Sequence, residues 1–138
     1  MTFVRGQRAV VADASVAVRL LLGDPPWIAA WRAWTTAGAM ILVPAHFGHE
    51  VANALLRSAR IGAPEAIAGL ARLWRTGFAV ADRRLGGLEG SIVLAERHGL
   101  SIYDAAYLDL AIDIDGELAT LDGPLRLAAE AEGVPLLG

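Results

Sequence analysis

The chain has 138 residues, a formal net charge of −3 and a hydrophobic content of 55%. Its 12 basic residues are all arginines and it has no cysteine, which excludes Schiff-base and Walker-type lysine chemistry, disulfides and thiolate metal sites. No stretch approaches the roughly 18 apolar residues of a membrane span, and residues 1–8 lack the apolar run of a secretory signal. We therefore expect a single cytoplasmic domain over residues 1–138 that does not enter a membrane.

Short apolar runs alternate with helical patterns along the whole chain, and turn residues separate them. The predicted strands are one that ends at Asp13, one over Met40–Val43 ended by Pro44, and three over Gly77–Asp82, Leu118–Asp122 and, at the edge, Val134–Leu137. Between the first two strands lie a helix over Ser15–Leu22 and a helix that carries Trp27 to Trp34. The remaining predicted helices are Ala45–Arg60, Glu65–Arg75, Leu85–His98, Ser101–Ile112 and Gly123–Glu132.

This alternation predicts a parallel sheet with helices on both faces. The expected fold class is α/β, a three-layer α/β/α arrangement around a central, mostly parallel sheet of four to five strands. In such open sheets, ligands bind at the carboxyl ends of the strands. A functional site is therefore expected among the polar residues at these ends.

Three tryptophans, Trp27, Trp31 and Trp34, recur at spacings of four and three residues, so their indoles share one helix face. A buried stripe facing the core is the favoured interpretation. The alternative is an exposed apolar surface that docks a partner, because three indoles are a large volume for a small core. Both interpretations stay open at this point.

Four acidic residues are placed to reach the same edge of the sheet: Asp13, Glu50, Asp104 and Asp122. Each also has a structural explanation, because Asp13 and Asp122 could be helix N-caps, Asp104 could belong to a capping box with Ser101, and Glu50 could be a solvated helix residue. Clustered carboxylates are costly unless cations neutralise them. Oxygen ligands without cysteine or paired histidine favour Mg²⁺ or Mn²⁺, ions that usually act on phosphates.

Other catalytic motifs fail at specific residues. The segment His49–Asn53 resembles a zinc-protease helix but has Asn53 in place of the second histidine. Asp13 lacks the second acid of a phosphatase signature, and no glycine-rich dinucleotide loop follows the first strand. Ser91 lacks the context of a nucleophile elbow. A small-molecule phosphatase is disfavoured because phosphate-binding loops are missing.

Four sequence blocks resemble, in order, the signature blocks of PIN-domain ribonucleases, specifically VapC-type toxins. They are Val10–Ala17, Val43–Leu55 with Glu50-Val51-Ala52-Asn53-Ala54-Leu55, Tyr103–Ala111, and Leu118–Asp122. The resemblance spans nearly the whole chain, and the most specific part is Asp-Ala-Ala-Tyr before an Ala-Thr-x-Asp strand. One less typical feature is Gly123-Pro124, directly after Asp122, which is expected to make that turn more rigid.

The resemblance implies a metal-dependent endoribonuclease that is a homodimer and is inhibited by a VapB-type antitoxin. Asp13, Glu50, Asp104 and Asp122 match the family's acidic quartet, and Ser15, Asn53 and Thr120 match supporting polar positions. One or two Mg²⁺ or Mn²⁺ ions would then activate water for hydrolysis of an RNA phosphodiester. The rival hypothesis is a catalytically inactive PIN-like binding or assembly module.

Two further hypotheses concern the surface. The tryptophan face is predicted to be covered, at least in part, by the antitoxin or by the second subunit. Arg83 and Arg84 are weaker candidates for phosphate contacts, since a solvated pair of loop residues explains them as well.

Overall fold

A five-stranded sheet forms the centre of the computed structural model, which describes residues 7–138. All strand pairings in this part of the chain are parallel, and the strand order is β3-β2-β1-β4-β5. The strands are β1 (Ala9–Ala12), β2 (Met40–Pro44), β3 (Ala79–Ala81), β4 (Glu117–Ala119) and β5 (Leu136–Leu137). The predicted parallel α/β sheet is therefore confirmed, at the upper end of the expected strand number.

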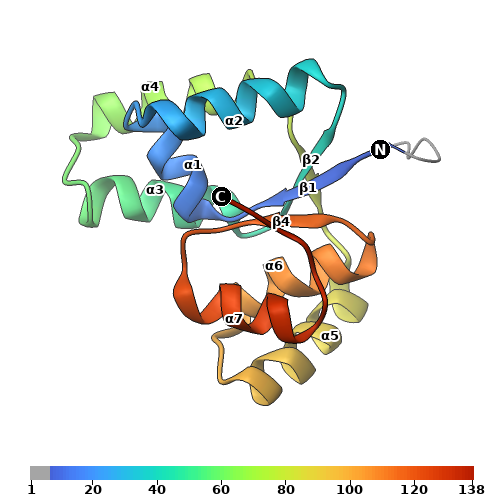
Figure 1. Ribbon diagram of the computed structural model, residues 1–138. Coiled ribbons are helices and arrows are strands. Elements are labelled where there is room, and N and C mark those ends of the chain that lie inside the picture. Colours follow the sequence, from blue (N-terminus) through green and yellow to red (C-terminus); the bar gives the residue numbers. More distant parts are fainter. Residues whose placement is uncertain (1–6) are drawn as a thin grey trace.

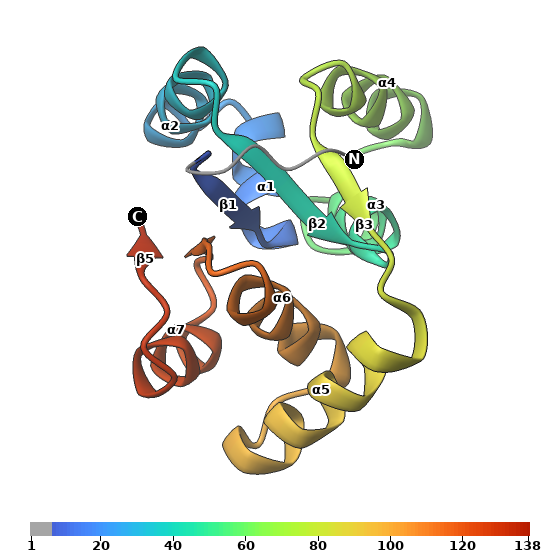
Figure 2. The same ribbon diagram turned by 90° about the vertical axis from the view of Figure 1, so that its right-hand side faces the viewer.

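Helices cover both faces of the sheet. They are α1 (Ala14–Leu21), α2 (Pro25–Thr36), α3 (Phe47–Arg57), α4 (Ala63–Trp74), α5 (Arg84–His98), α6 (Ile102–Asp113) and α7 (Gly123–Ala131). Helices α1–α4 form the layer on one face, and α5–α7 form the layer on the other (Figures 1 and 2). The three-layer prediction is confirmed. No helix in the described part of the chain has both the length and the apolarity needed to cross a bilayer.

The central strands are continuous apolar runs because they are buried from both sides. Val10, Val11 and Leu118 are fully buried, as is Leu42 in the neighbouring strand. This pattern is typical of parallel strands between two helix layers. Pro44, expected to stop the second strand, is the last residue of β2 and lies in register with Ala81.

The tryptophan face belongs to the core. Trp27, Trp31 and Trp34 are 8%, 3% and 4% exposed. The ring centres of Trp31 and Trp34 lie 5.9 Å apart, and those of Trp27 and Trp34 lie 6.5 Å apart. Helix α2, which carries these indoles, packs against α1 and β2. The hypothesis that an antitoxin or a second subunit covers this face is therefore wrong, because the protein's own core covers it.

The strand near Asp122 is shorter than predicted. β4 ends at Ala119, and Asp122 is the N-cap of α7 rather than the last residue of a strand. Pro124 occupies the first turn of α7, where its fixed φ is compatible with the helix. Asp122 therefore reaches the sheet edge through a short loop.

Candidate functional site

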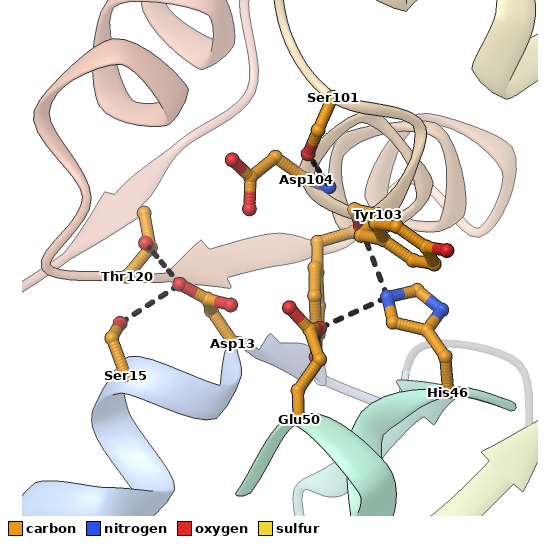
Figure 3. A network of polar contacts seen from close by, with 9 residues as sticks. Asp13, Ser15, His46, Glu50, Ser101, Tyr103, Asp104 and Thr120 are labelled. Carbon is orange, nitrogen blue, oxygen red and sulfur yellow. Dashed lines mark hydrogen bonds and ion pairs between the residues drawn. The ribbon is translucent and has the colours of Figure 1, made fainter. Parts of the chain in front are cut away.

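All four predicted acids line one open pocket at the carboxyl ends of β1 and β4. The pocket has a volume of about 610 Å³ and is lined by Asp13, Glu50, Asp104 and Asp122, together with Ser15 and Asn53. Asp13 and Glu50 come from the layer of α1–α4 and its strand connections, and Asp104 and Asp122 come from the layer of α5–α7. Figure 3 shows Asp13, Glu50 and Asp104 close together. We call this the acidic pocket.

Asp13 is the most buried of the four acids. It follows β1 directly and is 4% exposed. Its Oδ2 accepts hydrogen bonds from Ser15 Oγ (2.8 Å) and Thr120 Oγ1 (2.7 Å). Burial raises the pKa of Asp13 to about 6, with smaller contributions from Glu50 and Asp104, although the two hydroxyls oppose the shift. The side chain makes no cap bond to α1, so the N-cap explanation does not account for it.

The two hydroxyls that hold Asp13 also fix the loop after β4. Ser15 Oγ accepts a hydrogen bond from the Leu121 N–H (3.0 Å), and Thr120 Oγ1 accepts one from the Asp122 N–H (3.0 Å). Each hydroxyl donates to the carboxylate and accepts from the backbone at the same time. Ser15 and Thr120 therefore tie Asp13 to the loop that carries Asp122. Thr120 is fully buried and is not among the residues that line the acidic pocket.

Glu50 lies in the first turn of α3 and is held through one oxygen. Its Oε1 accepts a hydrogen bond from Tyr107 Oη (2.7 Å) and lies 3.0 Å from His46 Nε2. Burial alone would raise the pKa of Glu50, but the contacts with His46 and Tyr107 outweigh it and lower the pKa. Burial and the neighbouring Glu50 raise the pKa of Tyr107, so its hydroxyl stays protonated as a donor.

Asp104 lies in the first turn of α6. Ser101 is the N-cap, and its Oγ accepts a hydrogen bond from the Asp104 N–H (3.1 Å). Burial raises the pKa of Asp104, and the carboxylates of Asp122 and Glu50 raise it further, while contact with Ser101 opposes the shift. The expected serine cap is present, and the carboxylate of Asp104 lies among other acids.

Asp122 acts as a helix cap as well as a pocket residue. Its Oδ2 accepts a hydrogen bond from the Leu125 N–H (2.9 Å). The structural explanation offered for Asp122 from the sequence is therefore correct, and the residue also lines the acidic pocket. Oδ2 of Asp122 thus caps the N-terminus of α7.

His46 and Tyr107 both hold Glu50, but only His46 is indicated by the sequence. His46 stands one helical turn before Glu50, on the same polar stripe of the predicted helix, which makes it a possible hydrogen-bonding neighbour. Its Nε2 also lies 3.1 Å from the carbonyl oxygen of Tyr103, which links α3 to the start of α6. Tyr107 stands three residues after Asp104 on the same helix, but its contact with Glu50 spans 57 residues, and no local pattern reveals it.

Arg83 is not the solvated loop residue that was expected. Its guanidinium contacts Asp109 (2.6 Å) and Asp113 (3.5 Å) of α6. These ion pairs direct Arg83 to the neighbouring helix rather than to a phosphate. Arg84, in contrast, is exposed at the first position of α5.

The fold and the order of the site residues define the class of protein. Residues 10–131 match the PIN domain, and the chain belongs to the PIN-domain family. It is 35% identical over 120 residues to Ribonuclease VapC3 of Pyrobaculum aerophilum, a match that covers 84% of this chain and 91% of the relative.

Solved structures share the same fold. VapC20 of Mycobacterium tuberculosis, a toxin that cleaves the sarcin-ricin loop, superposes with a TM-score of 0.68 at 22% identity, over 86% of this chain and 94% of that chain. VapBC2 of Rickettsia felis, bound to a DNA fragment of its promoter, gives a TM-score of 0.70 at 12% identity, over 94% and 97%.

The pKa of Asp13 predicts how stability depends on pH when no metal is added. The folded carboxyl has a pKa of about 6 and the ordinary value is 3.8, so the folded state holds the proton more tightly. This tighter proton binding adds roughly 3 kcal/mol to the free energy of unfolding below about pH 4. The added stability is lost as the pH rises through 6. Asp13→Asn has no such proton, so it should gain stability relative to wild type between pH 4 and pH 7. Urea unfolding of both proteins in EDTA at several pH values measures this difference. If the free energy of unfolding changed with pH equally in the two proteins, the prediction would be contradicted.

Proposed function

We propose that this chain is a divalent-metal-dependent endoribonuclease and the toxin of a VapBC-type toxin–antitoxin pair. The observation that carries the proposal is the convergence of Asp13, Glu50, Asp104 and Asp122 on one pocket in a PIN-domain chain. The similarity to a VapC ribonuclease supports the substrate class. A VapB-type antitoxin, a homodimer and a cytoplasmic location complete the proposal.

The donor set of the acidic pocket fits Mg²⁺ or Mn²⁺. The hydrogen bonds to Asp13 and Glu50 engage Oδ2 and Oε1, which leaves Oδ1 and Oε2 as hard-oxygen donors. Within residues 7–138, no three acidic or histidine side chains already stand together as a metal-binding group. Mg²⁺ keeps several waters and commonly binds through one or two carboxylates, so the remaining acids can hold it through those waters. Asp13, Glu50, Asp104 and Asp122 are the residues that would hold the ion.

Residues of this chain supply the carboxylates for phosphodiester hydrolysis and fix their orientation. A divalent cation, when bound, adds positive charge for the phosphate and makes water a better nucleophile at neutral pH. Ser15 and Thr120 fix the orientation of Asp13, while His46 and Tyr107 fix that of Glu50. Asn53 also lines the acidic pocket, where its amide would be available to the RNA chain. The proposed reaction requires no protein nucleophile.

RNA cleavage by the purified, partner-free protein tests the proposal. We expect cleavage of single-stranded RNA in Mg²⁺ or Mn²⁺, loss of cleavage in EDTA, and recovery when the metal is restored. Addition of the cognate antitoxin should suppress it. A folded protein that cleaves no RNA with either ion would instead support the rival hypothesis, a binding or assembly module that retains the acids as structural residues.

A further inference from the structure

A second pocket adjoins the acidic pocket. It has a volume of about 240 Å³, and its walls include His46 after β2, Arg84 and Leu88 at the start of α5, and Tyr103 at the start of α6. His46 contacts Glu50 of the acidic pocket, and Tyr103 immediately precedes Asp104 in the chain. The two pockets are therefore neighbours, divided by the contact between His46 and the start of α6.

Tyr103 presents an aromatic ring that is fixed on one side and open on the other. Its ring packs edge-on against that of His46, with ring centres 5.4 Å apart at an angle of 63°. Its carbonyl oxygen lies 3.1 Å from His46 Nε2. The residue is nevertheless 61% exposed, and the ring projects away from the carboxylate of Asp104 (Figure 3). An ordered, exposed ring beside a phosphate-processing site is suited to stacking with a nucleic-acid base.

Arg84 brings a guanidinium to the wall of the second pocket. In the described residues it makes no ion pair, whereas its neighbour Arg83 is bound to Asp109 and Asp113. Arg84 has a φ of 54°, which is uncommon for a residue with a side chain. The Asp82 carboxylate holds this conformation by accepting the Arg84 N–H (3.0 Å). The Asp82 carboxylate also lines this pocket but is bound to the backbone N–H of Arg84, so the guanidinium of Arg84 stays available to a phosphate.

We infer that the second pocket binds the nucleotide next to the scissile phosphate, with its base stacked on Tyr103 and a phosphate at Arg84. This inference rests on the proposed ribonuclease function and adds a subsite that binds a base by stacking. The stacking face accepts any base, so the subsite supplies affinity and register rather than a hydrogen-bonded sequence code. Neither side chain belongs to the acidic quartet, so RNA binding at the subsite can be measured without metal.

Binding in EDTA separates this subsite from the chemistry. The probes are a short fluorescein-labelled single-stranded RNA of mixed sequence and an abasic ribose-phosphate chain of the same length. Wild type should bind the RNA more tightly than the abasic chain. Tyr103→Leu should bind the RNA from about five-fold to about a hundred-fold more weakly and leave the abasic chain unaffected. Tyr103→Phe, which keeps the ring, should behave as wild type.

A charge variant tests the phosphate contact. Arg84→Gln should weaken binding of both probes and reduce the slope of log affinity against log salt by about 0.7, the value for one phosphate on a single strand. Arg32→Gln is the matched control, because Arg32 is an exposed arginine on α2 in the opposite layer. The control should change neither affinity nor slope.

Several outcomes would overturn the subsite. They are equal affinity of wild type for the two probes, an unchanged RNA affinity in Tyr103→Leu, or an effect of Tyr103→Leu on oligomeric state alone, which would assign the surface to a second copy of the chain. Cleavage assays keep the two proposals apart. If wild type cleaves RNA but Tyr103→Leu keeps the wild-type KM, only the subsite fails, whereas absence of cleavage in wild type is a failure of the proposed function.

Discussion

Asp13→Asn should reduce RNA cleavage in Mg²⁺ or Mn²⁺ by at least about a hundredfold, while the far-UV circular dichroism stays native-like. The asparagine oxygen can still accept hydrogen bonds from Ser15 and Thr120, so the loop after β4 should keep its place. A neutral amide, however, is a poor ligand for a hard cation. Initial rates on a labelled single-stranded RNA measure the loss.

Asp24→Asn is the matched control for this experiment. Asp24 is also an aspartate at a helix N-cap whose side chain makes no cap bond, but it does not line the acidic pocket. Its variant should cleave RNA at the wild-type rate. Comparable cleavage by a well-folded Asp13→Asn protein would remove Asp13 from the catalytic assignment.

Trp31→Ala should lower the free energy of unfolding by about 3–5 kcal/mol, because it leaves a large cavity in the core. Trp31 is 3% exposed and packs against Trp34. Its Nε1 is buried without a hydrogen-bond partner in the described residues, so Trp31→Phe should cost less, since it removes that unsatisfied donor along with part of the volume. Urea unfolding at neutral pH measures both variants.

Trp74→Ala provides the comparison on the surface. Trp74 is 50% exposed, so its truncation should cost clearly less than that of Trp31. If Trp31→Ala had wild-type stability and instead lost antitoxin binding, the interface hypothesis rejected above would be restored.

The sequence predicted the architecture and the convergence of the acids for the same reason. Asp13 ends an apolar run that is buried from both faces, and such runs define parallel strands whose carboxyl ends meet at one edge. The predicted helix over Ala45–Arg60, which follows the second strand directly, likewise placed Glu50 near this edge. These features depend on local periodicity, which a single sequence displays.

Features that depend on contacts between distant residues could not be predicted in this way. The predicted strand over Leu118–Asp122 stops at Ala119 because the hydroxyls of Ser15 and Thr120 bind the next N–H groups and turn the backbone. Whether the indoles of α2 faced the core or a partner depended on the volume between α1, α2 and β2. The sequence pattern carries no measure of that volume.

The bond between Thr120 and Asp13 joins residues 107 positions apart, and this separation has a consequence during synthesis. β1 and Asp13 leave the ribosome well before β4 and the loop that fix the carboxylate. Until then the nascent chain has neither Asp104 nor Asp122 and no Thr120 to orient Asp13. The acidic pocket can therefore form only after the segment through Asp122 has been synthesised.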